Sequence, residues 1–589
     1  MTMDNDPTPA RPTGFLTELQ LGRLRWDLIS PFPAPDPEEQ LRGDRAVADL
    51  MGLLREQVDP TEVDRTERLP EGYHEALTAR GYFKLMDPPA RGGLGLSSHS
   101  AFRVIQAAAA WSVPACYAMA VHLGLGAGVY LPLLTDDLAA DLGALLDTGA
   151  ISGDADTEPT GAINRTRATS AVPTEDGTGY LISGEKIFIQ NGPIARLLRV
   201  SATVRENGEE YIRLFFVDTE APGFTVKSWH EYLGLKGLPN AALTLDRVFV
   251  PRSRMFTGRQ GWTSDEEWRL SPELNAISAH GRMFPISAPA LAIAKLALHW
   301  QREFVRRRTA HGRALDDFDE VQRIVAGTAA EVFALEAVTD WCLLAAERHP
   351  GVDVVPEQTA AKNITSLTCW SIVDRTVSLL AGEGFETARS KARRGAEPLP
   401  LERFFRDARA LRIAGGVDFM VDHYIARGAL LAHYDAPDAS TAAGTDAPPL
   451  PDEERLSERN RAHLHAIAEH ADRFACVCRE LTKHHPDREE LFEQERTLIL
   501  LGRITSELFT MTAALARAAR LGGDAQHLAD IFCDGARHRI TDAWARLDAD
   551  GEADHAAACA AWLHGERLEF LVDGVTTVTP PVTLDEESC

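Results

Sequence analysis

The spacing of apolar residues changes twice along this chain, and these changes limit the folds it can adopt. From about residue 41 to 149, apolar residues recur with the spacing of amphipathic helices. From 150 to 262 they alternate with polar residues between Gly, Pro, Asn and Asp turns, which predicts an antiparallel sheet. Helical spacing returns from 263 to 432. Helices, then a sheet, then helices argue against an alternating βαβ fold.

The 589-residue length predicts several structural units, because one hydrophobic core does not grow to this size. Residues 1–40 are rich in Pro, Asp and Glu and are expected to form an irregular arm. Residues 433–454 have almost no large apolar side chain, which indicates a linker. Helical spacing predicts an additional helical domain over 455–575, followed by a loose tail over 576–589.

The formal net charge of −26 disfavours non-specific binding to nucleic acids and anionic lipids. The N-terminus lacks the cationic and apolar segments of a secretory signal. We also expect no membrane-spanning helix, since no apolar run reaches about 18 residues. The eight cysteines are scattered without CxxC pairs, so we expect reduced thiols and predict no metal site. These features predict a cytoplasmic protein.

Several short segments follow one another between about residues 65 and 430. They are LTARGYFKLMDPPARGGLGL, DADTEPTGAI, GEKIFIQNG, GLPNAALTLDRVFVPRSRMF, RRRTAHGRAL, SLLAGEGF and FFRDARALRIAGG. In this order and spacing they resemble the acyl-CoA dehydrogenase family of flavoproteins. The helical extension beyond the linker is similar to the long, very-long-chain type within that family.

The resemblance implies a mainly α fold, with a helical domain, a central antiparallel β-domain and a four-helix bundle followed by the extra helical domain. It also implies FAD, which would lie between the sheet and the bundle of one subunit and touch a second, so at least a homodimer is expected. In the family's chemistry, a base takes the α proton of an acyl thioester while flavin N5 takes the β hydride.

Three positions of the sheet segments match family positions beside the flavin ring. By this resemblance Thr157 lies by the polar edge of the flavin, and Phe188 covers the ring. Gln190 stands where the family usually places a hydroxyl near N5. For Phe188, packing in the core without a ligand is the alternative.

Four further positions match the part of the family that holds the pyrophosphate and adenine of the cofactor. Arg308 is expected to pair with the pyrophosphate bound to the neighbouring subunit, since a guanidinium fork suits phosphate oxygens. His311 stands where an aromatic residue is usual, and Ser378 and Gly382 lie in the turn near the adenine half. The alternatives are a solvated charged face for Arg308 and core packing for His311.

The catalytic base of the family is missing from both of its usual places. Counting from Arg406 and Asp407 puts the usual Glu on Gly415. Some members place a Glu on an earlier helix, just before a recurrent Arg. That Arg corresponds here to Arg282, preceded by Gly281, and an ungapped count puts Arg282 itself in the slot. We therefore assign Arg282 to the substrate site.

Asp418 is the candidate replacement, because it lies three residues after Gly415 and would share its face on a continuous helix. The alternative is that Asp418 caps a helix or contacts a ribose. Glu383 and His280 are weaker candidates, which we expect to lie outside the slot. A further departure is Asp156, which we expect to add negative charge beside the flavin and to disfavour an anionic reduced form.

The sequence therefore predicts an FAD-dependent dehydrogenase that introduces an α,β double bond into an acyl thioester, carried by CoA or by a carrier protein. An electron-transfer flavoprotein or oxygen would accept the electrons. One alternative is a flavin-dependent monooxygenase or oxidase on the same fold, which needs no α-proton base, and another is a non-catalytic scaffold. Membrane association is doubtful, because the C-terminal helices lack a strongly basic amphipathic face.

Overall fold

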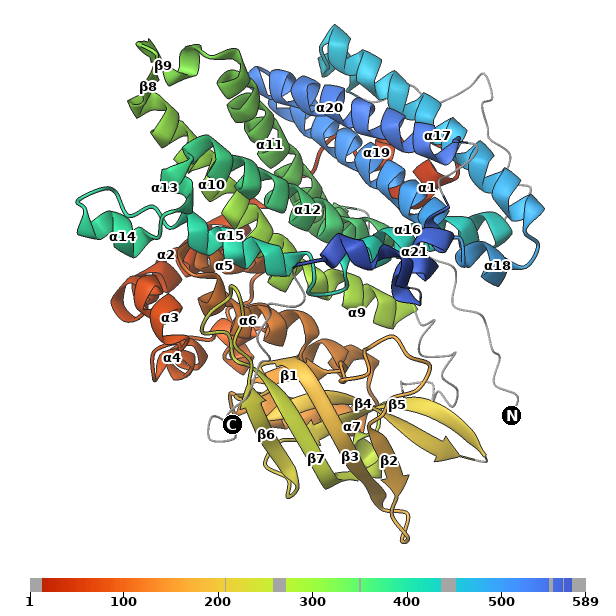
Figure 1. The fold of residues 1–589 in the computed structure, drawn as a ribbon. Helices are drawn as coiled ribbons and strands as arrows, with labels where there is room; N and C mark the ends of the chain where they lie inside the picture. The colour runs from red at the N-terminus through yellow and green to blue at the C-terminus, as the bar shows by residue number, and fades with distance from the viewer. Residues whose placement is uncertain are drawn as a thin grey trace.

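The computed structural model describes seven stretches of the chain, which are 13–206, 208–257, 272–348, 351–435, 452–549, 554–564 and 566–574. Helices dominate, and a curled sheet lies at one end of the molecule (Figure 1). The layers follow the order of the apolar patterns in the sequence.

The N-terminal helical layer is built on α2 (Pro37–Gln57), α5 (Ser98–Trp111) and α6 (Val113–Leu125). Asp36 caps α2 by accepting hydrogen bonds from two amides of its first turn, and Pro37 occupies the first helical position. The shorter elements of this N-terminal layer are α3 (Pro60–Thr66), α4 (Tyr73–Ala79), α7 (Asp136–Asp147) and the 3-10 turns η2 (Tyr82–Lys84), η3 (Pro89–Arg91) and η4 (Ala127–Leu133).

The segment expected to be an irregular arm is partly helical. Its described part contains α1 (Phe15–Gln20) and η1 (Trp26–Leu28), while residues 1–12 lie outside the described ranges. Phe15 is fully buried between Trp341 and Phe509, and the amide of Leu16 donates to Glu357 Oε1 at 2.7 Å. Burial against helices far away in sequence stabilises α1, so local composition does not predict it.

The central domain is a seven-stranded sheet in the order β1-β4-β2-β3-β7-β6, with β5 paired to β4. Its strands are β1 (Ser152–Ala155), β2 (Ser170–Pro173), β3 (Gly179–Gln190), β4 (Leu197–Glu206), β5 (Glu209–Asp218), β6 (Phe224–Trp229) and β7 (Asn240–Pro251). The turn η5 (Arg252–Arg254) follows. The pairing is mostly antiparallel, as predicted, but β1 and β2 each pair in parallel with β4.

The sheet is fixed to the helical layer by buried polar contacts. Asn191, just after β3, donates through Nδ2 to the carbonyls of Ala118 in α6 (3.0 Å) and Ser152 in β1 (3.1 Å). The Ser152 amide in turn donates to His122 Nδ1 of α6 at 2.9 Å. Each bond satisfies a polar group that burial would otherwise leave unpaired, so β1 and the end of β3 have a fixed position against α6.

The bundle contains four long helical rods. The first joins α9 (Pro272–Arg282) through a π-helical turn (Met283–Ser287) to α10 (Ala288–Arg307), and the others are α11 (Asp319–Arg348), α12 (Val355–Leu380) and α16 (Asp418–Asp435). Shorter elements connect them, namely β8 (Thr309–Ala310), β9 (Arg313–Ala314), η7 (Leu315–Asp317), α13 (Gly382–Phe385), α14 (Ala388–Arg393) and α15 (Leu401–Leu411).

The extra C-terminal helices pack directly on the bundle. They are η8 (Glu453–Arg455), α17 (Glu458–His484), α18 (Arg488–Phe492), α19 (Glu495–Leu521), α20 (Asp524–Leu547), α21 (His555–Leu563) and η9 (Glu566–Val572). The helix α19 packs against α11 and α16 (Figure 1). Residues 436–451 of the predicted linker, residue 575 and the predicted tail over 576–589 lie outside the described ranges.

Three helical segments are long and apolar enough to cross a membrane, judged by length and composition alone. This finding corrects the expectation that the chain has no such segment. The three segments are Val113–Leu133, Glu273–Arg307 and Glu495–Leu521. Scattered polar residues interrupt each apolar run without removing its high mean hydropathy. Most of each apolar window (67, 78 and 83%) is buried inside the protein, where these segments form interfaces between helical layers.

Candidate active site

The short loop between α15 and α16 carries Gly415, one of the two positions predicted to lack the base. Gly415 and Gly416 have φ angles of +69° and +104°, a region that residues with a Cβ rarely adopt. The helix that would place Gly415 and Asp418 on one face is therefore interrupted here. A Cβ at Gly415 would lie 3.5 Å from Arg282 Cγ and 3.5 Å from Ile286 Cγ1, which is ordinary contact without a clash.

Arg282 lies directly against this loop. Its Nε donates a hydrogen bond to the carbonyl of Gly415 at 2.8 Å. Gly281 has a different environment, because a Cβ there would lie 2.1 Å from the carbonyl oxygen of Gly124 in α6. Gly281 thus permits close packing of α9 on α6, and Arg282 is the residue that faces Gly415. The two predicted base positions converge in space through Arg282.

Among the described residues, no carboxylate balances the charge of the Arg282 guanidinium. Within the described ranges no carboxylate lies at ion-pair distance from it, and burial lowers its pKa, with Tyr424 only partly opposing this effect. The π-helical turn at Met283–Ser287 follows immediately, and such turns frequently occur at functional sites. An unpaired cation therefore occupies the place where the family resemblance leads one to expect an anion.

Lys362 of α12 is a second cation at this loop, and the sequence pattern did not single it out. Its side chain is fully buried, and Nζ donates to the carbonyl of Gly416 at 2.6 Å. Burial and the charge of Arg282 lower the pKa of Lys362 to about 8, although Asp418 and Asp422 oppose the shift. The only sequence signal was a lysine between the small and apolar residues of QTAAKNITS.

Asp418, the candidate replacement base, is bound by neighbours within the chain. Its Oδ2 accepts from Arg412 Nε at 2.8 Å, and Oδ1 accepts from the amide of Phe419 at 2.8 Å. Burial alone would raise its pKa, but these two bonds hold the pKa below its usual value. Such a carboxylate is a weak base, so the geometry favours the alternative of a helix-end contact.

The two weaker candidates have partners away from Gly415. The ring of His280 lies between Ser98 Oγ (3.4 Å) and Gln358 Nε2 (3.2 Å), on the side of α9 that faces α5 and α12. Glu383 forms ion pairs with Arg307 and Arg308 at the far end of α10. Neither contact brings a carboxylate or an imidazole to the loop at 415.

The predicted flavin-ring residues lie together on β3 and the loop beside it. The carbonyl of Thr157 accepts from the Ile187 amide at 3.0 Å, which holds the β1–β2 loop against β3. The ring of Phe188 is 54% exposed, has a φ of +58° and lies 4.8 Å from the ring of His230. The side-chain Nε2 of Gln190 donates to Asn191 Oδ1 at 3.1 Å. An exposed aromatic face is thus presented near the C-terminal end of β3.

The Thr-Glu-Pro turn is held by an ion pair that sequence reasoning did not identify. Glu158 and Lys186 are both fully buried at the side chain and meet at 2.8 Å, and Glu158 also accepts from the amides of Ala168 and Thr169. Asp156 pairs with Arg167 at 3.2 Å, which lies in the same loop. The charge of Asp156 is therefore compensated, which removes the basis for expecting it to repel an anionic flavin.

The segment 230–235 connects this end of β3 to α15, the helix before Gly415. His230 accepts from the Phe188 amide at 3.1 Å, and five residues later the Leu235 amide donates to Asp407 of α15 at 2.5 Å. Burial raises the pKa of Asp407 to about 6. This connection places the exposed ring of Phe188 on the side of the bundle where α15 leads into the Gly415 loop.

The remaining predicted cofactor residues lie at the other end of the bundle. Arg308 and Gly382 line a hollow of about 620 Å³, together with Glu383, Glu386 and Arg394. Arg308 pairs with Glu383 at 2.5 Å. His311 is exposed at the tip of the β8–β9 hairpin, with a φ of +53°, and Ser378 is exposed on the last turn of α12.

A comparison with known proteins decides the family. The chain is 31% identical over 572 residues to a probable acyl-CoA dehydrogenase FadE10 of Mycobacterium tuberculosis, covering 89% of this chain and 84% of that protein. The chain belongs to the acyl-CoA dehydrogenase family. Residues 155–248 match the family described as Acyl-CoA dehydrogenase, middle domain, and residues 279–430 match Acyl-CoA dehydrogenase, C-terminal domain. It is an FAD-dependent oxidoreductase of this class.

Other acyl-CoA dehydrogenases extend the comparison. A benzylmalonyl-CoA dehydrogenase of Aromatoleum aromaticum is 26% identical, covering 65% of this chain and 97% of that protein. An acyl-CoA dehydrogenase complexed with FAD from Bacillus anthracis has the same fold, with a TM-score of 0.72 at 18% identity, covering 92% of this chain and 94% of that one. The latter match includes the extra C-terminal helices, since it spans nearly the whole chain.

The donor groups of this acyl-CoA dehydrogenase fit FAD and lie in two separate parts of the chain. The exposed ring of Phe188 suits a flavin ring, and the guanidinium groups of Arg308 and Arg394 suit phosphate. The hairpin beside Arg308 lies at the opposite end of the molecule from the sheet (Figure 1). The 20 residues of α10 alone separate Arg282 from Arg308 by roughly 30 Å.

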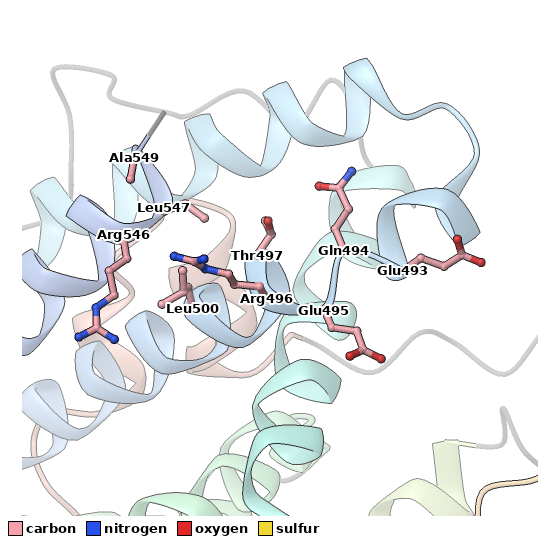
Figure 2. Close-up of a pocket in the computed structure, with 9 residues that line it drawn as sticks. All are labelled: Glu493, Gln494, Glu495, Arg496, Thr497, Leu500, Arg546, Leu547 and Ala549. Atoms are coloured by element: carbon pink, nitrogen blue, oxygen red, sulfur yellow. The ribbon is translucent and has the colours of Figure 1, made fainter. Parts of the chain in front are cut away.

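Another hollow, of about 530 Å³, lies in the C-terminal helices far from these residues in sequence. It opens between the start of α19 and the end of α20, with Arg496 extending toward the helix of Arg546 (Figure 2). Glu493 and Glu495 point away from it in this view (Figure 2). It contains none of the predicted site residues, and its exposed mixed polar lining does not resemble a buried catalytic slot.

Proposed function

We propose that this acyl-CoA dehydrogenase removes hydrogen across the α and β carbons of an acyl thioester, at a site formed by the Gly415 loop and Arg282. The observation that carries the proposal is the convergence of Arg282 on Gly415, on the side of the bundle reached from Phe188 through segment 230–235. When bound, FAD supplies the hydride acceptor. The protein has to place the substrate and control its proton.

The chain's own groups make the removal of an α proton difficult. Arg282 is a cation in the slot, Lys362 is a buried cation behind it, and Asp418 is held by Arg412. Loss of a general base typically slows a reaction about 10²–10⁴-fold. We therefore expect slow oxidation of simple saturated acyl-CoAs.

We further propose a homodimer that shares its cofactor sites. The β8–β9 hairpin that follows Arg308 and the sheet that carries Phe188 lie at opposite ends of the molecule (Figure 1), so we expect a second chain to supply one of the two contacts to each FAD. The surface beside Arg308 supports an interface, because Phe385 of α13 is 81% exposed next to the hollow. An electron-transfer flavoprotein is the proposed acceptor of electrons, with oxygen as the alternative.

A flavin-dependent monooxygenase or oxidase is the second candidate, and the missing carboxylate favours it. Such an enzyme activates oxygen at reduced flavin and does not remove an α proton. It would leave its flavin unreduced by acyl thioesters and would consume oxygen when a reductase supplies electrons.

The test is an anaerobic titration of the purified flavoprotein with acyl-CoAs of short, medium and long chains. The proposal expects partial or slow bleaching of the flavin absorbance and an enoyl-CoA product detected by mass spectrometry. A flavin that no thioester bleaches, but that uses oxygen productively after chemical reduction, would establish the second candidate instead. Absence of flavin binding after reconstitution would leave only the non-catalytic scaffold.

A further inference from the structure

The unpaired guanidinium of Arg282 indicates what the site accepts. Its Nε is occupied by the Gly415 carbonyl, which fixes the orientation of the guanidinium plane. In the part of the chain that the structure describes, no hydrogen-bond acceptor is assigned to its two terminal nitrogens. A half-buried guanidinium with free donors is costly unless a ligand pairs with it, and carboxylates match its fork.

The carboxylates near this loop already have partners. Asp418 is bound to Arg412, and Asp422 accepts from Asn363 (2.7 Å) and Arg503 (3.0 Å). Lys362 adds a further positive charge beside Gly416. The loop is therefore a local cationic site in a protein whose formal net charge is −26. Such a site attracts an anion despite the acidic surface.

We propose that Arg282 binds a carboxylate carried by the substrate, which is an acyl thioester with a second carboxylate on its α carbon. This inference rests on the proposed dehydrogenation and names its substrate class. The position follows from Gly415, the usual place of the catalytic Glu, where a Cβ would lie in ordinary contact with Arg282, 3.5 Å from its Cγ. A Glu side chain extending from this loop would act on the α carbon, so a substrate carboxylate held by Arg282 beside the same loop lies at that carbon.

This substrate makes an enzyme base unnecessary. The bond between the α carbon and the carboxylate breaks, CO₂ leaves, and the electron pair of that bond becomes the new α,β double bond. The β hydride leaves to the flavin, which is the oxidant of the established family chemistry. The substrate loses CO₂ and one hydride, and the product is the enoyl thioester. Charge balances because the substrate carboxylate and the transferred hydride each carry one negative charge.

The first measurement is binding, with a matched pair of ligands that cannot be dehydrogenated. Malonyl-CoA carries the α carboxylate and has no β hydrogen, and acetyl-CoA differs from it only by lacking that carboxylate. Calorimetry on the flavin-loaded protein should show malonyl-CoA binding about tenfold or more tightly, as expected for a charge-assisted pair. Arg282→Gln should remove this preference, Arg282→Lys should keep part of it, and Arg302→Gln on exposed α10 should keep it all.

The second measurement is anaerobic bleaching by butyryl-CoA, octanoyl-CoA and palmitoyl-CoA, each beside its α-carboxy derivative. We expect at least one α-carboxy compound to bleach the flavin about tenfold or more faster than its parent, with one CO₂ released per flavin reduced. Equal bleaching by both members of every pair, unchanged in Arg282→Gln, would overturn the inference and leave the proposed function standing. If no thioester bleaches the flavin, the proposed function itself fails.

Discussion

At Gly415 the usual Glu side chain is missing, and the backbone also adopts a left-handed conformation that disfavours a Glu. A Glu at this position would need to adopt a φ of +69°, at a cost of about 1 kcal/mol or more in stability. Gly415→Glu and Gly415→Ala should both lower the free energy of unfolding by about this amount, measured by thermal unfolding of the flavin-loaded protein.

The two Gly415 variants should differ in ligand binding. The Glu carboxylate would reach Arg282 and compete with malonyl-CoA, so Gly415→Glu should weaken its binding about tenfold. Gly415→Ala carries the same backbone strain without the charge and should bind within about twofold of wild type. Equal weakening by both variants would show that loop strain, and not charge, controls the site.

Lys362 makes the site sensitive to pH. Arg282 of α9, Arg412 after α15, and Asp418 and Asp422 of α16 face it, and burial lowers its pKa from 10.5 to about 8. The preference for malonyl-CoA over acetyl-CoA should therefore fall between pH 7 and 9, as the ammonium is lost. Calorimetry at both pH values checks this, and Lys362→Met should show a smaller preference that no longer changes with pH.

The contribution of Lys362 to protein stability should rise with pH, whereas its contribution to ligand binding should fall. A base with a lowered pKa in the folded state contributes stability that is present above its unfolded pKa and is lost as pH falls through about 8. Lys362→Met should therefore be more stable than wild type at pH 7, and this difference in stability should be smaller at pH 10.

In the binding measurement, a malonyl-CoA preference that is constant from pH 7 to 9 would contradict the charge assigned to Lys362.

The sequence points to several candidate site residues because their neighbours form recognisable motifs. Gly415 was found by counting from Arg406 and Asp407, and Phe188 from the GEKIFIQNG segment. Lys362 and the Glu158–Lys186 pair were missed because a buried cation has no distinctive spacing. Its partners are a carbonyl or a carboxylate that only the fold brings near.

At the scale of elements, α19 of the C-terminal unit reaches the active-site loop. Arg503 of α19 pairs with Asp422, and Asn363 joins Asp422 to the carbonyl of Asp418. Gly502 permits this approach, since a Cβ there would lie 2.1 Å from the carbonyl of Asp422. We infer that the extra helices help to position the loop that carries Gly415.

Arg503→Met tests this connection. Removing the guanidinium leaves the buried Asp422 carboxylate with one partner fewer, which should cost about 1–3 kcal/mol in stability. If α19 positions the loop, malonyl-CoA binding should weaken as well. Arg459→Gln is the matched control, because Arg459 lies in the same unit and pairs with Asp530 at the surface. A loss of stability without a change in binding would limit α19 to a packing role.

The elements themselves were predictable where one face of a segment is buried along its length. Alternation over 179–190 and 240–251 gave β3 and β7, but the parallel pairing of β1 with β4 depends on the path of the chain in space. The helix α1 has only six residues, and its stability depends on burial against Trp341 and Phe509, so the sequence indicated only an irregular arm.

At the scale of the whole molecule, the proposed homodimer predicts that cofactor binding depends on assembly. Arg308→Ala should weaken FAD binding about tenfold by removing a phosphate contact. Glu383 competes for Arg308 in the single chain, so Glu383→Gln should leave FAD binding equal to wild type or tighter. The release of FAD from both variants can be measured by flavin fluorescence as the protein is diluted. Retention of FAD by a monomer of wild type would contradict a cofactor shared between chains.

The central claim is that no side chain of this protein serves as an α-proton base at the Gly415–Arg282 site. The most direct test is to incubate the flavin-loaded wild-type protein with octanoyl-CoA in deuterated water and to measure deuterium at the α carbon by mass spectrometry. We predict no incorporation beyond that of octanoyl-CoA incubated without protein. Incorporation catalysed by the protein at the rate of flavin reduction would contradict the account.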